Sequence, residues 1–508
     1  MSSFDASSGR IERLVIVGGG TAGWMSAIYL NRVMREYKAQ VVLVESPTLG
    51  TIGVGEATIP SLVHFFRGLK IDEREMMRRC SATFKVGIKF EDWSAEGETY
   101  WHPFGPAGAR IDNLDLFHFW MKRRLAGGTR MAYADYSAQV QMAEGDKAPR
   151  PIGGNYAPQD LPFYAYHLDA AALAEFLRET ATREGVQHLF GDVKDAALDG
   201  QGNIETLDIG GDRRISGDFF IDATGFSGRL IEKCLGDPWI DWSRYMLCDT
   251  AVTMPLPRSE RFPSYTRSSA MEAGWRWEIP LSHRTGSGYV FSSAHLSLEA
   301  ATDALIARSG LRKASAADPR ALSFRVGRRA NFWARNCVSV GLSSGFIEPL
   351  ESTGIHLIQQ ALMLLVEHFP DKAGNDSRRR AFNARMEETY NRVRDFIVLH
   401  YLLSRRKEPF WRDSRYAPVP DSLRELLELY DEAGRIDASK PQLFPDTSFY
   451  FILAGNGRLP AREIVEAAVA PEREVWLILD RVRAEAVALA RRLPSHKDYL
   501  TDLHRTPI

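Results

Sequence analysis

A short glycine turn near the N-terminus constrains this chain more than any other feature. Gly18, Gly20 and Gly23 follow an apolar stretch, 14–17, and precede a helix-like apolar run. In such a strand–turn–helix unit the first glycine permits the tight turn. The second lets a pyrophosphate approach the backbone, and the third allows the helix to pack closely on the strand. The sequence therefore predicts a parallel α/β module that binds a dinucleotide at a helix N-terminus, although a purely structural glycine turn would read similarly.

Neighbouring residues extend this predicted nucleotide site. A second apolar stretch, 39–44, ends at Glu45, where an acid usually holds a ribose hydroxyl. The glycine-rich stretch 47–60 cannot form a regular element, so we expect its backbone to approach a flat or charged ligand. The cofactor contacts predicted in this part of the chain are Gly18, Gly20, Thr21, Ala22, Gly23, Glu45, Gly55, Glu56 and Ala57.

The order of later segments favours FAD over a nicotinamide cofactor. A return strand at 186–193, a polar meander at 196–216 and a strand at 219–222 that leads into Ala-Thr-Gly are typical of flavoproteins with two dinucleotide-binding folds. Val193, Leu342 and Ile355 complete the predicted cofactor contacts. The predicted fold class is α/β with α+β insertions, a flavoprotein of the aromatic-monooxygenase type with an added, mostly helical substrate module.

We expect the cofactor module to be discontinuous in the sequence. It should comprise residues 1–110, 160–235 and 325–370, and the substrate module residues 111–159, 236–324 and 371–508. The two could also count as one composite domain. Helices are predicted at 376–406, 422–432 and 461–493 from their amphipathic patterns.

Composition narrows the classes of function. The 508 residues carry a formal net charge of −1, so no bulk field attracts nucleic acid or an anionic membrane. The four cysteines are scattered without metal-binding spacing, which suits a reducing cytoplasm and predicts no metal site. No apolar signal core and no run of about 18 apolar residues occurs, so we expect neither export nor a membrane span.

Three further stretches carry side chains that could do chemistry. Residues 82–90 alternate like one strand, with Lys85 and Lys89 on the same face. The pattern alone indicates two solvated lysines. The aromatic cluster 99–104, which includes His102 and Phe104, could be core or could wall a pocket for a planar ligand. Trp275 and Trp277 would share one face of a strand, either as sheet packing or as a barrier that excludes water.

A second glycine-rich loop follows a predicted strand that ends at Gly341. It runs to Gly354, where a helix is expected to continue to His368. Backbone N–H groups at such a helix start are unpaired and carry partial positive charge, so they could hold an anion or the edge of a flavin. Glu351 beside them is either a simple capping acid or a functional carboxylate.

Together these stretches resemble the flavin-dependent tryptophan halogenase family. Trp275-x-Trp277-x-Ile279-Pro280 matches one family signature, and Phe346-x-x-Pro349-x-x-Ser352-x-Gly354 matches another. The glycine turn and the lysine of Phe84-Lys85 also fit. The similarity extends over nearly the whole chain to about residue 410 and then weakens.

The resemblance implies a chemistry and assigns roles. FAD would act in its reduced form, FADH2, supplied by a separate NAD(P)H-dependent flavin reductase. With O2 and a halide ion, chloride or bromide, it would generate hypohalous acid. Lys85 would deliver the halogen to an aromatic substrate, Glu351 would assist proton removal, and Trp275 and Trp277 would separate substrate from flavin. The resemblance places halide near Thr353 and Gly354 and the substrate ring near His102 and Phe104.

The C-terminal third departs from family members that act on free tryptophan. In those proteins acidic and aromatic side chains grip the amino acid. Residues 438–444 here contain no glutamate and no Phe-Trp pair. Lys440 is positively charged and would repel the ammonium group of tryptophan. We therefore expect an indole-type or other electron-rich ring rather than free tryptophan. A flavin-dependent aromatic monooxygenase and a non-catalytic flavin-binding protein remain as alternatives, and the pattern leaves a homodimer open.

Overall fold

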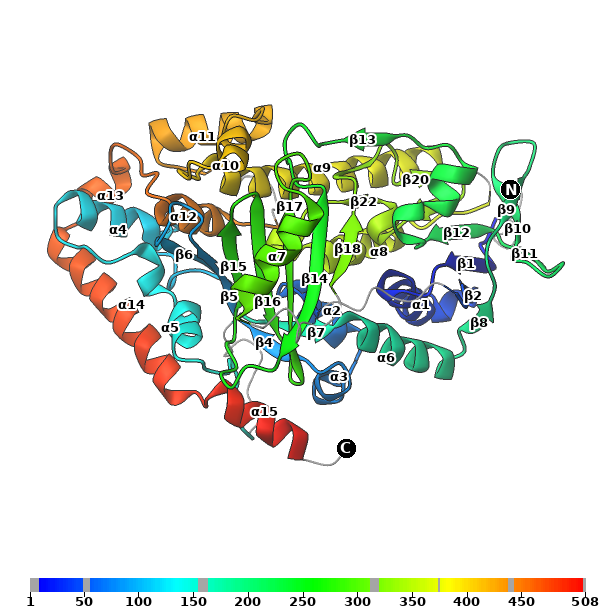
Figure 1. The fold of residues 1–508 in the computed structure, drawn as a ribbon, viewed down its shortest axis with the longest axis horizontal. Coiled ribbons are helices and arrows are strands. Elements are labelled where there is room, and N and C mark those ends of the chain that lie inside the picture. The colour runs from blue at the N-terminus through cyan, green and yellow to red at the C-terminus, as the bar shows by residue number, and fades with distance from the viewer. Residues whose placement is uncertain are drawn as a thin grey trace, which may run out of the picture.

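The computed structural model describes residues 9–48, 55–153, 163–310, 319–372, 375–436 and 443–505. Figure 1 shows a mostly parallel sheet on the right, a mostly antiparallel sheet in the centre and a helical module on the left. The chain passes between these layers several times, so each is built from segments distant in sequence. The expected α/β architecture with α+β insertions is confirmed.

The six-stranded sheet is the predicted nucleotide-binding layer. Its interior strands are short runs of Val, Ile, Leu and Phe that are buried on both faces, as parallel strands require. In spatial order the strands are β20 (Trp333–Ala334), β21 (Cys337–Ser339), β12 (Phe219–Asp222), β1 (Arg13–Val17), β2 (Gln40–Glu45) and β8 (Gln187–Phe190). The return strand predicted at 186–193 thus lies beside β2, in parallel register.

The first glycine turn joins β1 to α1 (Thr21–Val33) as predicted. Gly18 has φ +118°, and a Cβ placed there would lie 2.2 Å from the carbonyl oxygen of Ala223. A Cβ on Gly23 would lie 1.8 Å from the Gly18 carbonyl oxygen. Both positions therefore exclude any side chain, which explains two of the three glycines in purely steric terms.

The central sheet has seven strands and is antiparallel except where β15 pairs with β5. Its order is β18 (Arg320–Ser323), β14 (Thr250–Pro257), β17 (Arg284–Phe291), β16 (Gly274–Pro280), β15 (Thr266–Met271), β5 (Gly87–Glu91) and β6 (Thr99–Pro103). The predicted meander forms a separate small sheet of β9 (Asp195–Leu198), β10 (Ile204–Asp208) and β11 (Arg214–Ser216).

The prediction of one continuous strand over 82–90 was wrong. The segment divides at Val86, whose N–H bonds to the carbonyl of Ser264. β4 (Thr83–Lys85) pairs with β7 (Ala165–Asp169), whereas β5 joins the central sheet. The two lysines therefore belong to different sheets. Lys85 is fully buried, whereas the Lys89 side chain keeps 26% of its surface exposed. The interpretation of two solvated lysines on one face is therefore wrong for Lys85.

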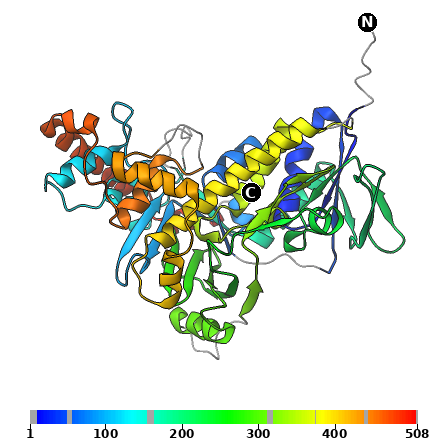
Figure 2. The ribbon, with the colours of Figure 1, turned by 90° about the horizontal axis from the view of Figure 1, so that it is seen from above.

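Helices connect the layers. Figure 2 shows α9 (Asp376–Leu402) crossing the molecule from the parallel sheet toward the helical end, and it packs against α8 (Gly354–Glu367) on the way. The helix predicted at 422–432 is α11 (Asp421–Ala433). The helix predicted over 461–493 is instead two, α13 (Val465–Val469) and α14 (Glu472–Arg492), because Pro471 stands between them.

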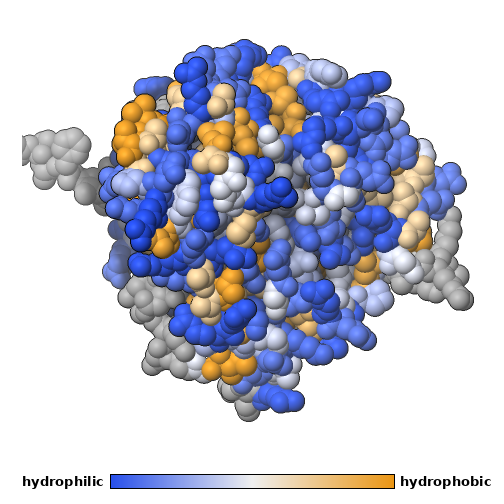
Figure 3. Space-filling model, turned by 90° about the vertical axis from the view of Figure 1, so that its left-hand side faces the viewer, coloured by the Kyte–Doolittle hydropathy of each residue, from blue (hydrophilic) through white to orange (hydrophobic). Residues whose placement is uncertain are grey.

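The helical module leaves some apolar surface in contact with solvent. Figure 3 views the side on which α13 and α14 lie and shows small apolar groups among polar side chains. Val465, Val469 and Leu477 are each more than 60% exposed. Within the described ranges no helix is long and apolar enough to cross a bilayer. All four cysteines are free thiols.

Candidate active site

The first glycine turn leaves room for a phosphate group. A Cβ added at Gly20 would meet no atom within 4 Å, in contrast to Gly18 and Gly23. Gly20 is also the N-cap of α1 and provides no side-chain cap, so the first N–H groups of the helix face this open space. These features fit the pyrophosphate of FAD, with Thr21 and Ala22 in the first turn.

Glu45 lies beside this turn, at the end of β2. Its carboxylate packs over Gly19, since a Cβ there would meet the Glu45 side chain at 2.1 Å. The His188 Nε2 lies 2.8 Å from Glu45 Oε2 and orients the acid. The position is the one expected for a ribose contact. Gly55, Glu56 and Ala57 form β3, Val193 lies beside the Arg229 guanidinium, and Ile355 is in the first turn of α8.

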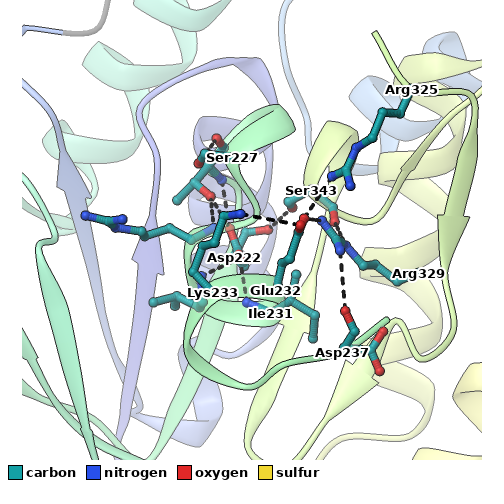
Figure 4. A network of polar contacts seen from close by, with 12 residues as sticks. Asp222, Ser227, Ile231, Glu232, Lys233, Asp237, Arg325, Arg329 and Ser343 are labelled. Atoms are coloured by element: carbon teal, nitrogen blue, oxygen red, sulfur yellow. Dashed lines mark hydrogen bonds and ion pairs between the residues drawn. The ribbon is translucent and has the colours of Figure 1, made fainter. Parts of the chain in front are cut away.

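A buried polar network fastens the second glycine loop to the parallel sheet (Figure 4). Asp222, at the end of β12, accepts N–H bonds of 2.8 Å from Leu230 and Ile231. Its backbone carbonyl accepts the Ser343 hydroxyl. Arg329 is fully buried, pairs with Glu232 and donates to the Ser343 carbonyl over 3.0 Å. The segment Gly341–Ser343, which contains Leu342, is therefore held rigidly next to the nucleotide turn.

The loop ends at the N-terminus of α8, which is also uncapped. Its N-cap is Thr353, whose side chain makes no capping hydrogen bond. A Cβ added to Gly354 would meet nothing within 4 Å. Unpaired N–H groups therefore face open space here as well, which suits a bound halide. The halide site that the family resemblance implies at Thr353 and Gly354 stays a prediction.

Lys85 is a buried amine with one hydrogen-bond partner among the described residues. Its side chain is fully buried, and its Nζ donates to Ser352 Oγ over 2.8 Å and lies 5.2 Å from the centre of the Phe104 ring. Burial lowers the pKa of Lys85 to about 7, although the nearby Glu351 charge opposes that shift. Ser352 itself has φ +59°, a costly conformation for a non-glycine residue that is typical of functional sites.

Glu351 is a buried carboxylate flanked by two imidazoles. Its Oε2 lies 2.7 Å from His102 Nδ1, and its Oε1 lies 3.0 Å from His400 Nε2 without the geometry of a hydrogen bond. Burial alone would raise the pKa of Glu351, but His102 and His400 lower it below the usual range. Glu351 is therefore ionised at neutral pH. One of its oxygens has no hydrogen bond from the described residues.

Sequence reasoning missed Glu348, a second buried acid three residues earlier. It has no exposed surface, and its Oε2 accepts bonds from the Trp275 indole N–H (3.0 Å) and the Tyr401 hydroxyl (2.5 Å). Burial raises the pKa of Glu348 to about 7. Its place inside the Phe346–Gly354 signature was the available signal, but nothing in that spacing separates it from a solvent-facing acid.

The two tryptophans of β16 form a wall. Both are buried, with ring centres 6.0 Å apart and planes inclined by 56°. Gly288 on the neighbouring strand leaves space for the Trp277 ring, since a Cβ there would lie 2.2 Å from it. Trp93 packs behind Trp275 at 6.2 Å. The pair thus has the bulk and rigidity expected of a barrier.

Aromatic residues line the other side of Glu351. His102 lies 5.3 Å from the Phe396 ring and 6.0 Å from the Phe444 ring. These two phenylalanines stack on each other at 3.9 Å. Phe104 packs with Ile59, Ala165 and Leu443. Sequence reasoning did not single out Phe396 or Phe444, because they lie in helical and C-terminal segments far from either signature.

The sequence predicts that residues 438–444 supply no acid to bind a substrate ammonium. Of these residues, the structure describes Leu443 and Phe444. One acid follows at once: Asp446 begins α12 (Asp446–Gly455). Its carboxylate pairs with Arg110 and accepts the N–H of Thr447. This acid is therefore already neutralised by a cation of the chain.

The comparisons with known proteins agree with this geometry. The family model for tryptophan halogenase matches residues 13–472. The chain is 37% identical to the tryptophan 6-halogenase ThaL of Streptomyces albogriseolus, over 97% of this chain and 99% of that protein. It is 35% identical to the tryptophan 7-halogenase RebH of Lentzea aerocolonigenes, over 98% and 99%. Among solved structures, the flavin-dependent halogenase BrvH from Brevundimonas sp. BAL3 superposes with a TM-score of 0.90 at 37% identity, covering 97% of this chain and 99% of that one.

A flavoprotein fold of the aromatic-monooxygenase type that carries a buried lysine, a buried carboxylate and a pair of buried tryptophans is that of a flavin-dependent halogenase. The chain belongs to the tryptophan halogenase family.

Proposed function

We propose that this enzyme generates hypohalous acid from halide, O2 and reduced flavin, and that Lys85 delivers the halogen to an electron-rich aromatic ring. The observation that carries the proposal is the environment of Lys85. Its amine is buried, bonded to Ser352, and has a pKa lowered to about 7. A substantial fraction is therefore neutral at physiological pH, which a nucleophilic amine requires.

The residues that would hold FAD lie around the two uncapped helix starts. Gly18, Gly20 and Gly23 would carry the pyrophosphate, Glu45 a ribose hydroxyl, and the Leu342–Ile355 region the flavin ring. Bound reduced flavin supplies the two electrons that O2 needs to oxidise halide. Thr353 and Gly354 would hold the halide beside it. A separate NAD(P)H-dependent flavin reductase would return the flavin to its reduced form.

The transfer step balances with this chain's own groups. The neutral Lys85 amine attacks the halogen of hypohalous acid, so an N–halogen bond forms and water leaves. The aromatic ring then donates an electron pair to the halogen and the N–halogen bond breaks. The nitrogen keeps the electron pair of that bond and takes a proton from the released water, which restores the neutral amine and leaves hydroxide. The ring cation loses its proton to the Glu351 carboxylate, which His102 and His400 flank, and that proton then neutralises the hydroxide. Because such a cation is a far stronger acid than any carboxylic acid, a carboxylate with a lowered pKa is still a sufficient base.

The substrate that fits this site best is an indole-type ring without an ammonium group. Near His102 the predicted substrate pocket is lined by the aromatic rings of Phe396 and Phe444. Of the acids in the described part of α12, Asp446 is already paired with Arg110. An ammonium would thus lose its hydration without gaining a free carboxylate. We expect a higher kcat/KM for indole than for tryptophan, and the reverse ranking would refute the substrate assignment.

A mass-spectrometric screen of an aromatic panel tests the function. The reaction contains the enzyme, FAD, a flavin reductase, NADH, O2 and bromide, which is easier to oxidise than chloride. Bromide-dependent incorporation of bromine that is lost in Lys85→Ala, with flavin binding retained, is the expected result. An oxygenated product formed equally without halide would identify a monooxygenase instead. If no aromatic compound of the panel gave a product, the result would favour a non-catalytic flavin-binding protein. The cytoplasmic location and the oligomeric state stay predictions.

A further inference from the structure

Glu348 is a fully buried acid for which the proposed chemistry has no use. It is surrounded by neutral groups: the Trp275 indole from β16, the Tyr401 phenol from α9 and the Cys248 thiol, whose sulfur lies 3.8 Å from the Tyr401 oxygen. Burial raises the pKa values of Tyr401 and Cys248 well above their usual ranges, so neither is charged at neutral pH. Among the described residues, no cation contributes to the environment of Glu348.

An ionised carboxylate in such surroundings would be costly. A buried charge needs a counter-charge or several hydrogen bonds, and Glu348 has two donors, both on Oε2. Its Oε1 has no partner in the described structure. With only neutral donors beside it and no cation among the described residues, the neutral acid is the form that this site favours, with Oε2 as the carbonyl-type acceptor.

The two hydrogen-bond donors show which side chains Glu348 orients. Trp275 belongs to the wall, and its N–H is the only polar atom of a ring that otherwise contacts aromatic groups such as Trp277 and Trp93. Ring stacking alone permits an indole to slide or tilt, whereas a hydrogen bond of 3.0 Å to a fixed oxygen sets its orientation. Tyr401 in turn orients the acid and packs against Trp93 at 5.4 Å.

We propose that Glu348 is a positioning residue that fixes the Trp275 indole by accepting its N–H, and that it does so as a neutral acid. This inference rests on the proposed role of the tryptophan wall. The tryptophans would separate substrate from flavin, and we infer that a wall held closed by Glu348 also prevents the oxidant from escaping before it reaches Lys85. The same signature therefore contains one acid that works through its charge, Glu351, and one that works through its lack of charge.

The decisive variant is Glu348→Gln, with Glu351→Gln as the matched control. An amide reproduces a neutral acid, with an acceptor oxygen and a donor, but it cannot reproduce a carboxylate. We expect Glu348→Gln to retain at least half of the wild-type halogenation rate, while Glu351→Gln loses most of it. A loss in Glu348→Gln as large as that in Glu351→Gln would overturn the proposal.

A second set of variants tests the link to Trp275. Glu348→Leu removes the acceptor, so the fraction of NADH consumption that yields halogenated product should fall several-fold. Oxidant trapped by an added amine scavenger such as taurine should rise correspondingly. Trp275→Phe keeps a ring but removes the donor and should produce the same shift, more weakly. The double variant should be no worse than Glu348→Leu alone. Fully additive losses, or unchanged coupling in both single variants, would contradict the assignment.

The protonation state is tested without any activity. A neutral acid with a raised pKa destabilises the fold increasingly as pH rises through the range where the unfolded group ionises and the folded one does not. The melting temperature of Glu348→Gln minus that of the wild type should therefore increase by several degrees from pH 5 to pH 8.5. A flat or decreasing difference would show that Glu348 is ionised. This measurement stands even if no substrate is found, so it separates the inference from the proposed function.

Discussion

Glu348 and Glu351 are three residues apart and equally buried, and each has one oxygen without a hydrogen bond from the described residues. Their surroundings are opposite. Glu351 faces His102 and His400, whereas Glu348 faces an indole, a phenol and a thiol. The pKa of Glu351 is lowered below its usual range, whereas burial raises the pKa of Glu348 to about 7. The comparison teaches that the role of an acid in this loop is decided by what the neighbouring strands and α9 bring to it.

Lys85 strengthens the contrast. Its pKa is lowered by burial, and the Glu351 charge opposes that shift. Among the described residues, Glu348 has no such effect on Lys85. Changes to Glu351 or Lys85 should therefore affect chemistry, and changes to Glu348 should affect containment.

The largest effect is expected from Lys85→Met. Halogenation should fall by at least about three orders of magnitude, since the group that carries the halogen is gone. Stability should increase, because the wild type buries an amine whose pKa has been lowered from 10.5 to about 7. That cost is on the order of 4 kcal/mol below pH 7 and disappears as pH rises to 10.5. Product analysis and thermal unfolding at pH 6 and pH 10 check both parts. A less stable variant would contradict the burial argument.

Glu351→Gln should have the next largest effect, a decrease of about 10²-fold in the halogenation step. The amide preserves the shape but supplies neither the charge that stabilises the ring cation nor a base for its proton. Single-turnover measurements with preformed reduced flavin isolate this step from flavin supply. NADH consumption should persist in steady state, with oxidant released instead of product. A rate within twofold of wild type would remove Glu351 from the mechanism.

A pH profile sharpens the comparison further. The neutral Lys85 amine is the reactive form, so the halogenation rate should rise as pH increases through about 7. Ionisation of Glu348 falls in the same range and should lower containment. The profile is therefore best measured in Glu348→Gln, where only the lysine limb remains. A rate that falls through pH 7 in that variant would show that the ammonium, not the amine, handles the oxidant.

The smallest effect is expected at His496, in α15 (His496–Arg505). Its Nε2 accepts the backbone N–H of Phe84 over 3.0 Å, and its Nδ1 bonds to the carbonyl of Phe262 over 2.9 Å. His496→Ala should lower kcat a few-fold with little change in KM, because the strand of Lys85 loses an anchor. His496→Asn should recover part of the loss. A change confined to KM would argue for a role in substrate binding instead.

The nucleotide module was accessible from the sequence because its constraints are local. Gly23 is required by a contact with the Gly18 carbonyl within a single strand–turn–helix unit, Gly18 has φ +118° in the turn itself, and the apolar strands are contiguous. Lys85 shows the opposite case. Its burial follows from the break at Val86 and from pairing with β7, about 80 residues away, which alternation along 82–90 cannot reveal.

The missed site residues share this non-local origin. His400 lies in the last turn of the long helix α9, and its Nε2 reaches Glu351 only through the packing of that helix against the loop. Burial raises the pKa of Glu348, and its two hydrogen-bond donors, Trp275 and Tyr401, are 73 and 53 positions away in the sequence. Resemblance to the family supplied Lys85 and Glu351, but the protonation of their neighbours required the assembled structure.

The bond between Phe84 and His496 has a consequence for the order in which the chain is made. The two residues are 412 positions apart, and α15 is the last of the described elements to leave the ribosome. The strand of Lys85 therefore acquires this anchor only after every other described element has been synthesised. In a nascent chain whose nucleotide module has already folded, the strand of Lys85 therefore still lacks the hydrogen bond to His496. Full support of the strand that carries Lys85 is thus coupled to completion of the described fold.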